Sequence, residues 1–305
     1  MPIDQAFLDQ LFDAEQPVAS SKLLALSTLA DDEASAFRAV WQEALARSRI
    51  HLLDRLISLA EDNAEADFDA IFRIGLDDPE SDVRRKAIDA LWECQERWLL
   101  NRLVAMAEGD ASNEVRATAA GALGRFVLLG TLDELRSSLV EEVETTLRCI
   151  VDNKAEPVAV RRRALEALAP SADPSVNDVI RDAYYSDEDE LKISAVFAMG
   201  QHCDEGWLPV LLAELRNSDE AMRFEAARAC GEMEDDRAVP GLIQLTKEPD
   251  PEIQEAAIEA LGRIGGQDAR AALRSCLKQK DQRVREAAQA ALEEIAANEN
   301  PLGSG

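Results

Sequence analysis

Apolar residues return every three or four positions along most of the chain, which is typical of helices with one buried face. The clearest stretch runs from Asp250 to Gly262, DPEIQEAAIEALG. Asp250 is placed to cap the helix, and Pro251 takes the first helical position, where a missing N–H costs nothing. Gly262 is expected to end the periodic run. Most inward positions are alanine, so the pattern predicts that another helix backbone comes close.

Six further copies of this stretch follow the same pattern, and an arginine or its substitute marks one position in each. The marks are Arg84, Arg116, Arg161, Lys192, Arg223, Gln254 and Arg285. Their successive steps are 32, 45, 31, 31, 31 and 31 residues. A period near thirty with a second helix in each interval is typical of a helical-repeat array. The sequence therefore predicts an all-α fold: an α-solenoid (superhelix) of stacked antiparallel helix pairs.

The regularity of the repeat divides the chain into three segments. Residues 1–62 carry helical patterning with the repeat blurred, and we expect a divergent N-terminal cap or degenerate repeat with Arg38 at the arginine mark and Trp41 where other repeats have alanine. Residues 63–297 form the repeat array, with an insertion around 130–145 that explains the long step. Residues 298–305, NENPLGSG, are expected to be a disordered tail.

Composition narrows the possible partners and the compartment. The formal net charge is −27, from 60 acidic against 33 basic residues, which argues against general binding to nucleic acid or anionic membranes. A basic protein partner would suit this charge, although an acidic solvated surface explains it as well. No signal peptide or membrane span is visible, so a cytoplasmic location is expected. The five cysteines form no CxxC pair and are expected to be small buried residues in a reducing compartment.

The pattern D-x-x-[VI]-R-x-x-A-x-x-A-L-G, over roughly residues 64–296, resembles the HEAT repeat, specifically the short bacterial kind named after phycobilisome lyase subunits. The resemblance implies that second helices line a concave face and that the marked arginines pair with acidic residues of the turns in an inter-repeat ladder. The acidic candidates are Asp78 and Asp110, six residues before an arginine, and Asp219 and Asp281, four before one. Lys192 and Gln254 depart from the pattern, so the ladder should be weaker there.

Enzymatic members of this superfamily are not supported by the residues. Deoxyhypusine hydroxylases hold two irons through repeated His-Glu pairs, whereas this chain has only His51 and His202, followed by Leu52 and Cys203. Clustered cysteines for an iron–sulfur centre, a phosphate-binding loop and a G-x-S-x-G motif are missing from the sequence. We therefore expect no catalytic residues, no metal ligands and no cofactor.

The residues one and five positions after each arginine mark are neighbours on one helix face, and they should look into the concave groove. These candidate binding residues are Arg85, Arg162, Ile193 with Phe197, Phe224 with Arg228, and Glu255 with Glu259. They imply an apolar centre, an acidic C-terminal wall and basic clusters at residues 84–86 and 161–163. The apolar residues either form a binding patch or simply pack between helices. The arginines either bind an anion or pair locally with acidic residues.

Two functional hypotheses follow. The first is a non-enzymatic scaffold or adaptor that binds a protein partner, with a basic surface, on its concave face. The second comes from the family resemblance: a phycobilin lyase-type subunit that attaches, detaches or carries a bilin. In that case the central aromatic residues would hold the pyrrole rings and the arginine clusters the propionates. A bilin is expected only under this alternative.

Overall fold

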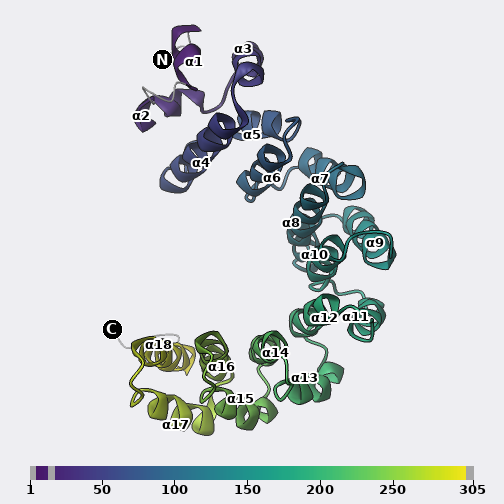
Figure 1. Cartoon of the computed structure of the whole chain (residues 1–305), viewed down its shortest axis with the longest axis vertical. Helices are drawn as coiled ribbons and strands as arrows, with labels where there is room; N and C mark the ends of the chain where they lie inside the picture. Colours follow the sequence, from purple (N-terminus) through teal and green to yellow (C-terminus); the bar gives the residue numbers. More distant parts are fainter. Residues whose placement is uncertain (1–4, 13–17, 300–305) are drawn as a thin grey trace. The chain divides into compact units, whose positions relative to one another are not determined.

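The computed structural model describes residues 5–12 and 18–299, and within these ranges the chain forms eighteen α-helices, three short 3-10 helices and no strand (Figure 1). The all-α prediction is confirmed. The chain divides into two compact units, residues 1–126 and residues 127–305, and the border between them lies inside helix α8.

Helices of the first unit lie in two rows. Its elements are α1 (Gln5–Gln10), α2 (Ser20–Leu23), η1 (Leu24–Leu26), α3 (Asp31–Glu43), α4 (Ala46–Asp62), α5 (Asp69–Gly75), α6 (Ser81–Ala90), α7 (Arg97–Gly109) and α8 (Asn113–Thr131). Helix α3 packs on α5, α4 packs on α6, and α5 packs on α6. We call the row of α3 and α5 the first helices and the row of α4 and α6 the second helices.

The second unit continues this scheme of helix pairs. Its elements are α9 (Ser137–Asp152), α10 (Val158–Leu168), α11 (Val176–Tyr184), α12 (Asp189–His202), η2 (Glu205–Trp207), α13 (Leu208–Glu214), α14 (Glu220–Met233), η3 (Asp236–Ala238), α15 (Val239–Leu245), α16 (Pro251–Ile264), α17 (Gly266–Cys276) and α18 (Gln282–Glu299). Each second helix from α10 to α18 packs on the next second helix, and each first helix packs on the second helix of its pair. The unit is an α-solenoid with one row of second helices.

The lengths and ends of the helices show where the expected insertion and the expected tail lie. The extra residues of the long repeat step lengthen α8 to 19 residues and α9 to 16, whereas the first helices α13 and α15 have 7 each. Helix α18 reaches Glu299, so the first two residues of the expected disordered tail are helical. Residues 300–305 lie outside the described residues.

Glycines at the end of the repeat pattern serve helix packing rather than helix termination. Helices α12, α14 and α16 continue two residues past Gly200, Gly231 and Gly262, so these glycines do not end the helices. A Cβ added at Gly200 would lie 2.6 Å from the Cα of Ala229 on the next second helix. The close approach of backbones predicted from the alanine-rich faces is confirmed.

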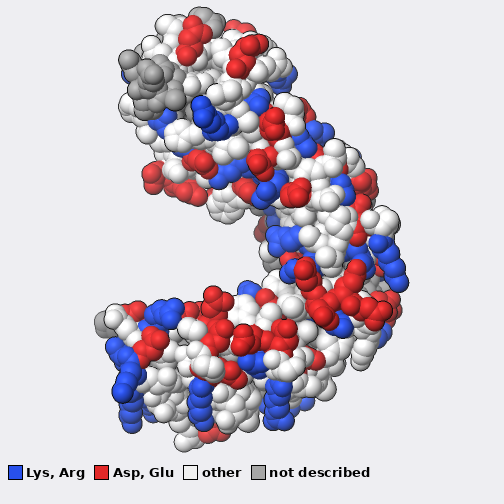
Figure 2. Space-filling view, viewed as in Figure 1, with Lys and Arg blue, Asp and Glu red and all other residues white. Residues whose placement is uncertain are grey.

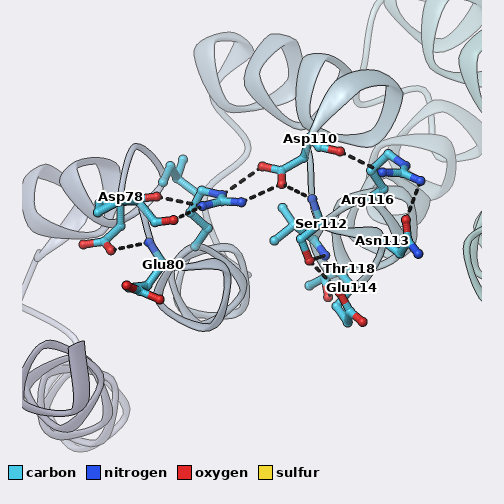
Figure 3. A network of polar contacts seen from close by, with 12 residues as sticks. Asp78, Glu80, Asp110, Ser112, Asn113, Glu114, Arg116 and Thr118 are labelled. Atoms are coloured by element: carbon cyan, nitrogen blue, oxygen red, sulfur yellow. Dashed lines mark hydrogen bonds and ion pairs between the residues drawn. The ribbon is translucent and has the colours of Figure 1, made fainter.

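The arginine ladder is present and connects consecutive repeats. Arg84 forms two bonds to the Asp110 carboxylate of the next repeat, Nε to Oδ2 at 2.8 Å and Nη2 to Oδ1 at 2.6 Å, and it donates to the carbonyl oxygen of Asp78 in its own repeat at 2.8 Å (Figure 3). Burial raises the pKa of Asp110, but the hydrogen bonds from Arg84 and the Ser112 backbone outweigh this and hold it below its usual value. Arg116 likewise donates to a carbonyl oxygen of its own repeat, that of Asp110.

In the second unit the ladder is discontinuous, as expected. Arg161 binds Glu188 at 2.5 Å and Arg223 binds Glu248 at 3.3 Å. Among the residues that the structure describes, the ion pair of Lys192 stays within its own helix, with Asp189 at 3.2 Å, and Gln254 donates to the Thr246 carbonyl. The ladder is therefore built from acids of the following repeat.

Asp219 and Asp281 were wrongly expected to be ladder acids. The Asp219 carboxylate caps α14 by accepting from the Met222 backbone N–H, and Asp281 accepts from the Arg283 backbone N–H. Their four-residue spacing before an arginine is thus the spacing of a helix cap, since the cap precedes the first helical turn.

The first ladder arginine is Arg49, and the expected role of Arg38 is wrong. Arg38 is exposed on α3, a first helix, whereas Arg49 lies buried on α4, a second helix. Arg49 Nη1 lies 3.1 Å from Asp78 Oδ2, and the indole Nε1 of Trp41 donates to the same oxygen at 2.7 Å. Residues 31–62 thus extend both helix rows.

The cysteines differ in accessibility, and the expectation that they are all buried is wrong for two of them. Cys94, Cys230 and Cys276 are buried, but Cys149 and Cys203 are exposed. Burial raises the pKa of the Cys230 thiol to about 12. The thiolate is the nucleophile, so a buried thiol with a high pKa is inert.

Alkylation of the native protein should follow this difference. We expect iodoacetamide at pH 8 to label Cys149 first and Cys203 more slowly, because burial and the carboxylates of Glu232 and Glu234 raise the pKa of the Cys203 thiol, while the three buried thiols react only after unfolding in urea. Peptide mass spectrometry of native and denatured samples would measure this. Fast native labelling of Cys230 would show that α14 is not packed as described.

Candidate functional site

Three of the candidate binding residues come together on the second helices α12 and α14. The guanidinium carbon of Arg228 lies 5.8 Å from the ring centre of Phe197 and 5.7 Å from that of Phe224. Both rings are half-buried and Arg228 is exposed. Ile193, also half-buried, lies one helical turn before Phe197 on α12 and extends the apolar surface. We call these four residues the aromatic patch.

Arg162 borders the patch within a polar network that joins α10 to α12. Its Nε donates to the hydroxyl of the buried Ser194 at 2.9 Å, and its Nη1 lies 2.9 Å from Glu190. The Ser194 hydroxyl donates to Glu166 at 2.7 Å, and Arg163 also binds Glu166, at 2.8 Å. The arginines at 161–163 are therefore paired with acidic residues. Local pairing was one of the two explanations that the sequence left open.

Glu225 lies beside the patch and was missed in the sequence, because it falls outside the two positions expected to face the groove. Burial raises the pKa of its carboxyl group; Arg228 lowers it, Glu166 raises it further and Arg162 lowers it. Arg228 lies 3.5 Å from Glu225. The half-buried carboxylate of Glu225 attracts the guanidinium of Arg228 and thereby fixes the position of its positive charge beside the two rings.

The acidic wall lies on α16, next to the patch. Glu255 is half-buried and Glu259 is exposed. Glu259 and Arg228 both line a cavity of about 20 Å³, which has room for about one water molecule. Figure 2 shows acidic side chains gathered over α12, α14 and α16, with basic ones along α13, α15 and α17. On the face shown in Figure 2, the acidic side chains thus lie over the second helices.

Arg85 belongs to the first unit and is not part of the patch. It lies on α6, where Nη1 is 3.5 Å from Asp82 one turn earlier, and its neighbour Lys86 binds Asp54 at 2.5 Å. The basic cluster at residues 84–86 is therefore engaged in ion pairs throughout, since Arg84 holds the ladder.

Tyr184 and Trp207 lie on the first-helix side. The Tyr184 hydroxyl donates to Glu214 at 2.5 Å, and Trp207 Nε1 donates to Asn177 at 2.7 Å. Both hydrogen bonds join neighbouring repeats, so packing between repeats accounts for Tyr184 and Trp207.

Within residues 5–12 and 18–299 no group of three or more His, Cys, Asp or Glu residues is arranged to hold a metal ion. In the same part of the chain no helix is long and apolar enough to cross a membrane. What the patch offers chemically is a half-buried aromatic surface with charged groups at its rim.

The repeat pattern, the helix rows and the ladder agree with a comparison to known families. A family model described as HEAT repeats matches residues 68–151 and 208–293. The chain belongs to the HEAT-repeat family. The finer assignment to the phycobilisome lyase kind is not supported by this match. A comparison with proteins of curated function found no match.

Solved structures of HEAT-repeat and related solenoids share the fold of this chain. The structure of Kap95p with RanGDP gives a TM-score of 0.54 at 15% identity, covering 94% of this chain and 44% of that one. Importin beta gives 0.50 at 14% identity, covering 90% and 43%. YibA of Escherichia coli gives 0.47 at 18% identity, covering 81% and 96%. The chain thus spans less than half of the first two relatives, and the likeness concerns the fold alone.

Proposed function

We propose that this HEAT-repeat protein is a non-enzymatic scaffold that holds a protein partner on the second helices of its second unit. The aromatic patch is the anchor. Its supporting observation is that Phe197 and Phe224, on adjacent helices, remain half-buried and share one exposed guanidinium. Hot spots of protein interfaces have this composition, with aromatic residues and arginine over a well-packed base.

The surrounding charges give the proposed surface its selectivity. Glu255 and Glu259 on α16 form an acidic rim, which favours basic residues on the partner and raises the rate of encounter. The fold is compatible with this role, since Kap95p has been solved with the protein RanGDP.

A bilin-binding subunit is the weaker proposal because its anion-binding groups are already paired. Propionates would need the cluster at 161–163, but each of its arginines binds a carboxylate: Arg161 with Glu188, Arg162 with Glu190 and Arg163 with Glu166. No observation favours this function over a protein scaffold.

Changing both phenylalanines of the patch to aspartate should abolish partner binding. In a pull-down from native lysate with mass spectrometry, we expect the variant Phe197→Asp with Phe224→Asp to lose proteins that the wild type retains, because two charges replace the apolar anchor. Leu128→Asp with Leu132→Asp is the matched control, since both leucines are exposed and the change of charge is the same.

Folding of the double variant must be checked by circular dichroism and thermal melting. Should it unfold, the milder pair Phe197→Leu with Phe224→Leu tests the same surface, because it keeps apolar volume and removes the cation–π contacts, worth about 0.5–1 kcal/mol each at exposed sites. A folded aspartate variant that retains every wild-type partner contradicts the proposal, and so does a leucine variant that binds the captured partner as tightly as the wild type.

A further inference from the structure

A larger cavity lies on the edge of the second unit, away from the aromatic patch. Its volume is about 590 Å³, within the usual range of binding pockets. It opens between the end of α9, the end of α11 and the loop before α12. Its apolar lining comes from Val151, Val179, Ala183 and Leu191. None of the candidate binding residues lines it. Arg161, the ladder arginine next to the candidate Arg162, does line it.

The polar lining is mainly acidic and largely unpaired. Asp152, Asp182 and Asp187 line the cavity and are exposed, and among the described residues no side chain forms an ion pair with their carboxylates. The Arg161 charge faces Glu188 and the Val151 carbonyl, at 2.5 Å and 2.8 Å. Three carboxylates therefore outnumber Lys154, the one lining cation that the ladder does not hold.

An aromatic ring stands at the same cavity. Tyr185 is 73% exposed, which is unusual for so large an apolar ring, and it lies edge-on to Tyr184 with ring centres 5.0 Å apart. Tyr184 is in turn fixed by its hydrogen bond to the buried carboxylate of Glu214. The neighbouring ring thus holds Tyr185 at the cavity rather than leaving it free.

We propose that this cavity binds a basic segment of a partner protein, in which an arginine or lysine side chain lies over Tyr185 and among the three aspartates. The aliphatic stem of such a side chain suits the apolar floor, its charge suits the carboxylates, and the exposed ring adds a cation–π contact. A metal ion does not fit, since no described group of carboxylates converges closely enough to hold one. An anion would be repelled.

This site is separate from the aromatic patch and does not depend on the proposed function of the patch. The ladder also departs from the other repeats here. Arg161 takes the carbonyl of Val151, ten residues back, whereas Arg84, Arg116, Arg223 and Arg285 each take the carbonyl six residues back. Arg161 therefore binds the last turn of α9 itself, whereas the other four arginines bind the turn between the two helices of their pair.

The test is a titration of the full chain with a fluorescein-labelled peptide of alternating alanine and arginine, seven residues long, in 150 mM salt. We expect saturable binding by fluorescence anisotropy, and no binding of the same peptide with citrulline in place of arginine. Replacing Asp152, Asp182 and Asp187 by asparagine should weaken binding about tenfold or more, because charge-assisted contacts are lost. Tyr185→Ala should weaken it about threefold, and Tyr185→Phe should not.

The matched control removes the same charge elsewhere: Glu134, Glu141 and Glu142, exposed and outside the cavity, are changed to glutamine. Equal weakening by both triple variants would show nonspecific attraction to an acidic protein and overturn the proposal. Spermidine binding as tightly as the peptide would overturn the assignment to a protein segment. Failure of the aromatic-patch variant in a pull-down leaves this titration unaffected, so the two proposals fail separately.

Discussion

Replacing Asp78 with alanine should destabilise the first unit by roughly 3–5 kcal/mol, because it leaves a buried arginine without its counter-charge. Side-chain exposure is 7% for Arg49 and zero for Asp78, so water cannot take over the lost contacts. The indole N–H of Trp41 and the backbone N–H of Glu80 lose their acceptor as well. One carboxylate thus connects α3, α4 and the turn before α6.

Urea unfolding followed by circular dichroism, with hydrogen exchange of α3, α4 and α6, would measure this loss. Asp82→Ala is the control, since its pair with Arg85 is exposed and should contribute less than about 1 kcal/mol. Replacing Arg49 by methionine together with Asp78 by leucine should recover part of the stability, because no buried charge is then left unpaired. A loss below 1 kcal/mol for Asp78→Ala would show that Arg49 reaches solvent.

Periodicity was sufficient to predict the fold class, because the same buried face returns with every repeat. It failed where two helix rows share one pattern. Arg38 and Arg49 both follow helical spacing, and only packing against α5 or α6 distinguishes a first helix from a second one. Likewise Asp219 lies at a spacing that suits either a ladder acid or a helix cap. The choice depends on a partner in the next repeat, Glu248, which local spacing does not reveal.

The candidate site was predictable in part. Facing positions on α12 and α14 identified Phe197, Phe224 and Arg228, which the structure brings together. Glu225 was missed because it falls outside the two positions expected to face the groove. The cavity beside Tyr185 was missed because no single repeat contains its lining. Its lining residues come from three separate segments of the chain.

Gly200→Val should destabilise the second unit by about 1–3 kcal/mol or more, through overpacking between α12 and α14. Even the first added carbon would lie 2.6 Å from Ala229 Cα and 2.7 Å from its Cβ, and a backbone atom cannot rotate away. Gly200→Ala should show the same effect at smaller size. Gly109→Ala is the control, since a Cβ there meets nothing within 4 Å and should change stability by no more than about 1 kcal/mol.

The rescue experiment separates backbone contact from side-chain contact. Adding Ala229→Gly to Gly200→Ala removes the Cβ clash but leaves the Cα in place, so we expect recovery of only part of the lost stability, measured by urea unfolding. Full recovery would show that the helices are not held at backbone distance. Because Phe197 and Phe224 lie on these two helices, any widening also separates the rings that share Arg228. Gly200→Ala should therefore weaken partner binding in the pull-down, although Gly200 lies outside the aromatic patch.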